Sequence, residues 1–142
     1  MSPLRSGPMS IEQEKTGMRL AIPLSLKLDG IGITLGDVIA RCRDRVVSPY
    51  LIHHTVRNSQ TVLGDPVGVT GITQAFRTAI KKAGIVPATG KQLPTFHEQR
   101  SLAERLYREQ GIDTKMLLGH RSQKTTDMYH DTRGEGWQTL VI

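Results

Sequence analysis

The sequence has 142 residues, enough for one domain with a single hydrophobic core, and its hydrophobic content of 37% is typical of a folded chain. The net charge of +6 favours a polyanionic partner, most commonly nucleic acid, although many basic proteins bind none. The single Cys42 excludes an intramolecular disulfide. No apolar run approaches the roughly 20 residues of a membrane span, and residues 1–10 lack a signal-peptide core, so we expect a cytosolic protein.

The N-terminal part of the chain predicts a β-hairpin. Residues 1–10 are rich in serine, proline and glycine and are expected to be a flexible lead-in, so that the domain covers residues 11–142. Within residues 11–22, the sequence Lys15-Thr16-Gly17 has turn chemistry, and the segment after it alternates as a short strand does. Pro23 ends that strand.

Two amphipathic helices are predicted in the middle of the chain. Residues 34–45 carry an apolar stripe at helical spacing, and Thr34 is a candidate N-cap. Residues 70–83 form the second helix, and Gly84 is suited to cap its C-terminus. The stretch between these helices is expected to be mainly loop.

The last third predicts a further set of helices and a terminal strand. Thr95 and Glu98 form a capping box for a helix over residues 95–110, and Gly111 can close it. Three shorter elements follow: a helix over residues 113–118, a helix over residues 122–130 and a strand over residues 137–142. The whole pattern predicts a mainly helical α+β domain with a minor antiparallel β element.

Four side chains of this last third have chemistry that suits a phosphodiester. Arg100 carries a planar, permanently charged fork for two phosphate oxygens, and it lies three residues after His97, so the two share a helix face. His97 and His120 can donate a hydrogen bond or move a proton near neutral pH. The hydroxyl of Tyr129 can form a covalent bond to phosphorus, which divides one displacement into two easier ones.

These residue types also have ordinary interpretations. A single His-x-x-Arg pair is common on helix surfaces. A metalloprotease helix would need a histidine where Ser101 stands, and His53-His54 lacks a third ligand, so neither a metal site nor a cofactor is predicted. Of the other tyrosines, Tyr50 is expected in the core and Tyr107 in packing or at the surface.

Four motifs taken together resemble the tyrosine recombinases, and among them the integrases of lambdoid phages. Residues 94–102 (PTFHEQRSL) resemble the stretch that carries a histidine and the family's second catalytic arginine. Residues 117–122 (LLGHRS) resemble its Leu-Leu-Gly-His box, and residues 125–130 (TTDMYH) resemble its nucleophile segment. Residues 12–17 and 21–23 resemble the β-hairpin that supplies its catalytic lysine. The resemblance covers nearly the whole chain from about residue 11.

The resemblance implies metal-free, site-specific recombination and integration of DNA by a tyrosine-recombinase-like catalytic domain. Tyr129 would attack the scissile phosphate and remain joined to the 3′ phosphate, releasing a 5′-hydroxyl. Arg100 and His120 would stabilise the charge that grows on the non-bridging oxygens. His97 would accept a proton or bind the phosphate, and Lys15 would protonate the leaving 5′ oxygen.

One part of the family's pattern is missing. The family has a first catalytic arginine on a helix before the lysine hairpin, and Arg5 is in the wrong context to replace it. We therefore expect an N-terminally truncated catalytic domain that is impaired by itself; the alternative is a non-catalytic DNA-binding remnant of a prophage integrase. The implied partners are double-stranded DNA and other integrase subunits, a tetramer in full-length members, in the cytoplasm of a bacterial host.

The C-terminal tail has two possible partners. Residues 137–142 (WQTLVI) are apolar and extended in character, and a strand at a chain end pairs with whatever edge is available. The tail can fold back onto the domain's own small sheet, or it can contact a neighbouring subunit, as the resemblance implies. Because the upstream strands look truncated, we expect the subunit contact or else a tail without order.

Overall fold

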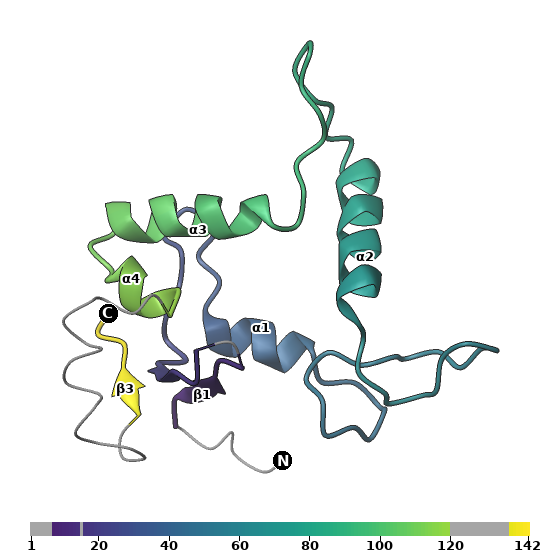
Figure 1. Ribbon diagram of the computed structural model, residues 1–142, viewed down its shortest axis with the longest axis horizontal. Helices are drawn as coiled ribbons and strands as arrows, with labels where there is room; N and C mark the ends of the chain where they lie inside the picture. The colour runs from purple at the N-terminus through teal and green to yellow at the C-terminus, as the bar shows by residue number, and fades with distance from the viewer. Residues whose placement is uncertain (1–6, 15, 120–136) are drawn as a thin grey trace. The chain divides into compact units, whose positions relative to one another are not determined.

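The computed structural model describes residues 7–14, 16–119 and 137–142. The elements in chain order are β1 (Met9–Glu12), β2 (Arg19–Ile22), α1 (Leu35–Arg41), α2 (Val69–Lys82), α3 (Glu98–Glu109), α4 (Thr114–Leu117) and β3 (Gln138–Thr139) (Figure 1). The chain divides into two compact units, whose boundaries fall inside α1 and α3. We call residues 1–38 with 104–142 the sheet unit, and residues 39–103 the central unit. The predicted helix over residues 122–130 lies outside the described residues.

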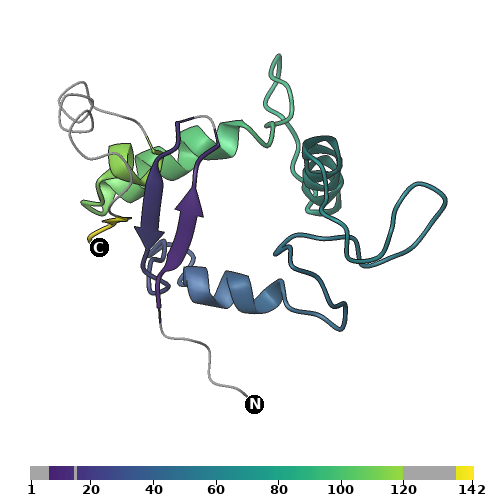
Figure 2. The ribbon, with the colours of Figure 1, turned by 60° about the horizontal axis from the view of Figure 1, so that its bottom comes forward.

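A mixed three-stranded sheet organises the sheet unit, in the order β1-β2-β3. β1 and β2 form the predicted antiparallel hairpin, with Met9 opposite Ile22 (Figure 2). β3 pairs with β2 in parallel, with Leu20 opposite Gln138, so the prediction of a purely antiparallel element is wrong. Parallel pairing is possible because a long connection, which includes the helices, separates the two strands in the chain. β1 also begins at Met9, inside the segment that was expected to be a lead-in.

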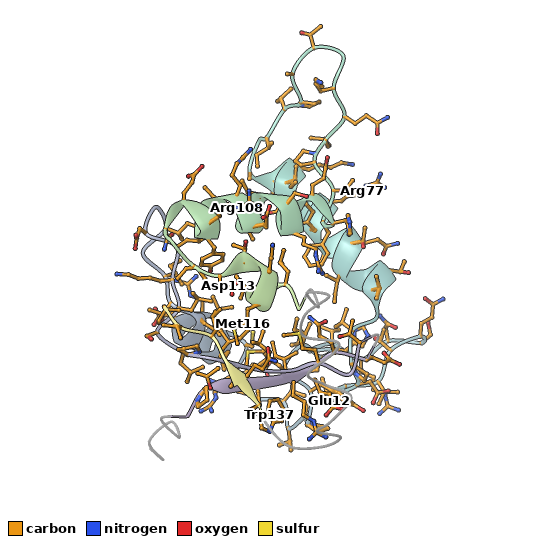
Figure 3. The ribbon with its side chains drawn as sticks, turned by 60° about the vertical axis from the view of Figure 1, so that its left-hand side comes forward. Glu12, Arg77, Arg108, Asp113, Met116 and Trp137 are labelled. Carbon is orange, nitrogen blue, oxygen red and sulfur yellow. The ribbon has the colours of Figure 1, made fainter. Side chains whose placement is uncertain are left out.

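The C-terminal tail packs onto its own sheet. The backbone N–H of Leu140 donates to the carbonyl of Ala21 at 2.9 Å, and the Leu140 side chain is only 1% exposed. It belongs to the buried cluster Leu20, Ile22, Leu26 and Leu140. Trp137 lies at the start of this tail (Figure 3). The expected absence of order is therefore wrong, because one edge of β2 accepts the tail within the same chain. The contact with a neighbouring subunit stays a prediction.

α1 begins where predicted and ends early. The Thr34 hydroxyl accepts from the N–H of Asp37 at 3.1 Å, and the Asp37 carboxylate accepts from the N–H of Thr34 at 2.9 Å. This confirms the predicted N-cap. The helix ends at Arg41, four residues before the predicted end. The Asp44 carboxylate accepts from the N–H of Val46 at 2.8 Å, a local turn that competes with further helix.

α2 and α3 end in the same glycine motif, as the sequence predicts. Beyond α2, Gly84 has a φ of 68°, and the N–H of Ile85 donates to the carbonyl of Ile80 at 3.3 Å. Beyond α3, Gly111 has a φ of 80°, and the N–H of Ile112 donates to the carbonyl of Tyr107 at 3.0 Å. These left-handed glycines allow the last carbonyls of each helix to be satisfied.

The central unit has a small apolar interior. Within residues 39–103, all of which are described, Ile80 is the one buried apolar side chain. Phe76 and Phe96 pack edge to face, with ring centroids 5.6 Å apart. Tyr50 is 50% exposed, so its predicted place in the core is wrong. None of the helices in the described part of the chain is long and apolar enough to cross a membrane.

Candidate functional site

His97 and Arg100 lie on the tight turn that opens α3. The capping box is present: the Thr95 hydroxyl accepts from the N–H of Glu98 at 3.4 Å, and the Glu98 carboxylate accepts from the N–H of Thr95. The N–H of Arg100 then donates to the carbonyl of His97 at 3.1 Å. Because an i to i+3 turn eclipses those two positions, the residues share a face, as predicted, and both are exposed.

The carboxylate in this turn is held ionised by its cap. The backbone N–H of Thr95, and then its hydroxyl, lower the pKa of Glu98 from its ordinary value, and nearby His97 lowers it further. The N-terminus of α3 favours negative charge, and here the Glu98 carboxylate supplies it while it accepts a hydrogen bond from Thr95.

The hairpin turn meets the C-terminal end of α4 within the sheet unit. The turn is closed by a bond of 2.7 Å from the N–H of Gly17 to the carbonyl of Gln13. The Gln13 side-chain amide donates to the carbonyl of Leu118 at 3.2 Å. Lys15 follows Gln13 by two residues and His120 follows Leu118 by two, so the chain neighbours of two predicted site residues are in contact. Lys15, His120 and Tyr129 themselves lie outside the described residues.

α4 is short and is fixed at both ends. The Asp113 carboxylate caps it by accepting from the N–H of Met116 at 3.1 Å, and Gly119 follows it with a φ of 68°. The chain turns sharply at Gly119, whose positive φ is one that glycine adopts readily. Met116 and Leu117 pack against the buried cluster of the sheet unit, and the buried Thr114 hydroxyl lies 3.4 Å from the Glu104 carboxylate. This packing fixes the point from which the chain continues to His120.

His53 belongs to a separate arrangement in the central unit. Its Nε2 lies 3.2 Å from both oxygens of Asp44, and its Nδ1 lies 2.8 Å from the carbonyl oxygen of Tyr50. The Tyr50 carbonyl, and then the Asp44 carboxylate, raise the pKa of His53 above its ordinary value. These residues border a cavity of about 400 Å³ that Cys42 also lines. In the described ranges, no three histidine, cysteine or acidic side chains gather closely enough to hold a metal ion.

Gln13 is the residue that sequence reasoning missed. It stands inside the segment that resembles the lysine hairpin, but nothing in the pattern gives it a role. Its partner Leu118 is 105 residues away, and a contact over that separation has no local signal in one sequence.

Comparison with known sequences shows that the chain is similar to phage integrases. The model of the Phage integrase family matches residues 3–135. The integrase of Enterobacteria phage P21 is 57% identical over 134 residues, which cover 94% of this chain and 35% of that protein. Prophage integrase IntE of Escherichia coli (strain K12) is 50% identical, over 94% of this chain and 36% of that protein. The chain thus spans little more than a third of the length of these relatives.

Solved structures show the same fold. The structure of the lambda integrase catalytic core matches with a TM-score of 0.70 and 29% identity, over 98% of this chain and 71% of that one. A lambda integrase tetramer bound to a Holliday junction matches with a TM-score of 0.67 and 32% identity, over 94% of this chain and 36% of that one. The predicted α+β catalytic-domain fold is therefore confirmed.

Proposed function

We propose that this chain, which belongs to the phage integrase family, performs site-specific DNA recombination by cutting and rejoining DNA through a 3′-phosphotyrosine. The match to the family over residues 3–135 is the observation that carries the proposal. The Tyr129 oxygen attacks the scissile phosphorus, and the bond to the 5′ oxygen breaks. Lys15 protonates that oxygen as it leaves. A 5′-hydroxyl from another strand reverses the step and restores the free tyrosine.

The opening turn of α3 supports a phosphate-binding role for two of the residues. Arg100 offers a guanidinium fork, and His97 lies on the same exposed face of the turn that opens α3. We assign Arg100, together with His120, to the charge that grows on the non-bridging oxygens. We assign His97 one of two roles: it accepts the proton that the Tyr129 hydroxyl loses, or it donates a hydrogen bond to the same phosphate.

The contact between the hairpin and α4 supports a shared task for Lys15 and His120. Gln13 and Leu118, each two residues away from one of them, are joined by a hydrogen bond of 3.2 Å. A general acid must lie within hydrogen-bond reach of the oxygen that it protonates, and that oxygen is bonded to the phosphorus whose charge His120 offsets. The bond between Gln13 and Leu118 joins the hairpin turn to the end of α4. The roles proposed for Lys15 and His120 require these two parts of the chain to be close.

The proposed partners are double-stranded DNA and further integrase subunits in the cytoplasm of a bacterial host. Solved lambda integrase structures include a dimer bound to a COC′ core site and a tetramer bound to a Holliday junction. The charge of +6 on this chain fits the phosphate backbone, and its DNA affinity should fall steeply with salt as counterions are released.

Covalent trapping tests the proposal. This chain replaces the matching segment of the phage P21 integrase, and the chimera is given a nicked P21 core-site duplex from which the released 5′ strand diffuses away. We expect a covalent protein–DNA adduct that Tyr129→Phe abolishes and that Tyr50→Phe and Tyr107→Phe leave intact. An adduct in the Tyr129→Phe chimera, or none in the unaltered chimera where P21 integrase reacts, contradicts the proposal. Binding without an adduct favours the non-catalytic remnant.

A further inference from the structure

We propose that Gln13 is a positioning residue that holds the lysine-bearing turn against the C-terminal end of α4, and that Gly119 is required to admit its side chain. The proposal rests on the function proposed above, because it concerns the delivery of the Lys15 proton. It adds a residue whose own side chain touches neither substrate nor reacting atoms.

All four polar groups of Gln13 are engaged, three of them within the turn. Its N–H donates to the carbonyl of Met18 at 2.9 Å, and its carbonyl accepts from the N–H of Gly17 at 2.7 Å. Its side-chain oxygen Oε1 accepts from the Thr16 hydroxyl at 3.0 Å. In the sequence, Lys15 stands between Gln13 and Thr16, the two residues that these bonds hold.

The fourth group of Gln13 reaches out of the turn. The side-chain nitrogen Nε2 donates to the carbonyl of Leu118 at 3.2 Å, and the Gln13 side chain is half-buried. Leu118 is the C-cap of α4, and its carbonyl lies at the helix end, where backbone carbonyls can accept from groups outside the helix. One amide thus bridges the Thr16 hydroxyl in the hairpin and the end of α4, and it fixes the distance between these two backbones.

Gly119 has two reasons to be glycine. Its φ of 68° lies in the left-handed region, which side chains with a Cβ rarely adopt. A Cβ at this position would also overlap the amide at the end of the Gln13 side chain, which would have to move away from Leu118. The Gln13 side chain therefore occupies the space that any other residue at position 119 would need, and the two residues act as one contact.

The test separates protonation of the leaving 5′ oxygen by Lys15 from every other step of the reaction. In the P21 chimera, the leaving 5′ oxygen is replaced by sulfur, so that a P–S bond breaks and the leaving thiolate needs no proton, since thiols ionise near pH 8.5. We expect Gln13→Ala to slow cleavage of the ordinary ester by about 10- to 100-fold, and to leave cleavage of the sulfur substrate near the unaltered rate. Lys15→Ala should show the same difference between substrates, and the double variant should add little to it.

Gln110 provides a matched control in the same unit. It is also half-buried, its Nε2 donates to the carbonyl of Lys27 at 3.0 Å, and its Oε1 accepts from the N–H of Asp29 at 3.0 Å. Gln110→Ala should leave the ratio of the two rates unchanged. If Gln13→Ala does not fold, Gln13→Glu replaces it in the test. This variant keeps the acceptor for the Thr16 hydroxyl and loses the donor to the Leu118 carbonyl.

The outcomes are distinct. Equal slowing on both substrates, or no slowing on either, overturns the positioning role of Gln13. A change in the rate ratio for Gln110→Ala as large as that for Gln13→Ala also overturns it, because any loosening of the unit would then suffice. If the unaltered chimera cleaves neither substrate while P21 integrase does, the proposed function fails and the inference with it.

Discussion

The contacts inside the sheet unit and those inside the central unit join residues at very different separations along the chain. In the sheet unit, Gln13 bonds to Leu118 across 105 residues, and β3 joins a strand near the other end of the sequence. In the central unit, side-chain hydrogen bonds bridge short stretches, such as the 16 residues from Ser48 to Gly64. Long-range contacts close large loops and form or break together, whereas short-range ones open one at a time. The loss of one contact should therefore destabilise the whole sheet unit, whereas in the central unit its effect should remain local.

The largest effect is expected from the tail. Leu140→Ala removes a side chain that is only 1% exposed and should lower the free energy of unfolding by about 2–5 kcal/mol. Denaturant unfolding followed by the fluorescence of Trp137, the single tryptophan, measures it. Val141→Ala, at a position 81% exposed, is the control and should change little. Similar losses for the two variants would mean that the tail does not pack as described.

A smaller and more local effect is expected from the core of the central unit. Ile80→Ala should lower the free energy of unfolding by about 2 kcal/mol, the low end of the same range, because few buried neighbours surround it. Amide hydrogen exchange should quicken in α2 and remain unchanged in β2. Val69→Ala, on the same helix and 80% exposed, is the control. Equal quickening in β2 would show that the units unfold together.

The capping box of α3 should be worth less. Thr95→Ala removes the hydroxyl that accepts from the N–H of Glu98 and should cost about 1 kcal/mol. Exchange of the Glu98 and Arg100 amides should quicken. Thr78→Ala removes an exposed hydroxyl that donates to the Gln74 carbonyl inside α2 and should change exchange little. If both threonines gave the same result, the box would not order the turn that carries Arg100.

The smallest effect should come from the His53–Asp44 pair. The pKa of His53 is raised, so its contribution is complete below the ordinary value of 6.5 and is lost as the pH rises through the raised pKa. The pKa of Asp44 is lowered, chiefly by the N–H of Val46, so its contribution is lost only as the pH falls below 3.8 through the lowered pKa. The pair is therefore most stabilising between these limits. Titration of His53 by NMR should give a lower midpoint in Asp44→Asn, and an unchanged midpoint would contradict the pairing.

The sequence predicts the features that depend on near neighbours. The Thr34 and Thr95 caps and the glycine after α2 each depend on residues three to five positions apart, and all are found. The backbone at Gly119 is of the same local kind, because a left-handed residue is most often glycine. Local chemistry is enough for such features.

What the sequence does not predict depends on distant partners. The direction of β3 and the docking of Leu140 are set by the free edge of β2, more than a hundred residues earlier. The early end of α1 follows from the bond between Asp44 and Val46, which competes with a helical pattern that continues. At the candidate site, Arg100 and His97 are brought together by spacing alone, whereas the contact that Gln13 makes depends on where Leu118 comes to lie.

The packing of the tail has a geometric consequence for Tyr129, the proposed nucleophile. Tyr129 lies ten residues after Gly119 and eight before Trp137, and both of these belong to the sheet unit. A chain spans at most about 3.3–3.6 Å per residue, so the Tyr129 Cα lies within roughly 35 Å of Gly119 and 28 Å of Trp137. The pairing of β3 with β2 thus sets the second of these two limits, because it holds Trp137 at the sheet. Undocking the tail would remove that second limit and, under the proposed mechanism, lower the effective concentration of the Tyr129 hydroxyl at the phosphate.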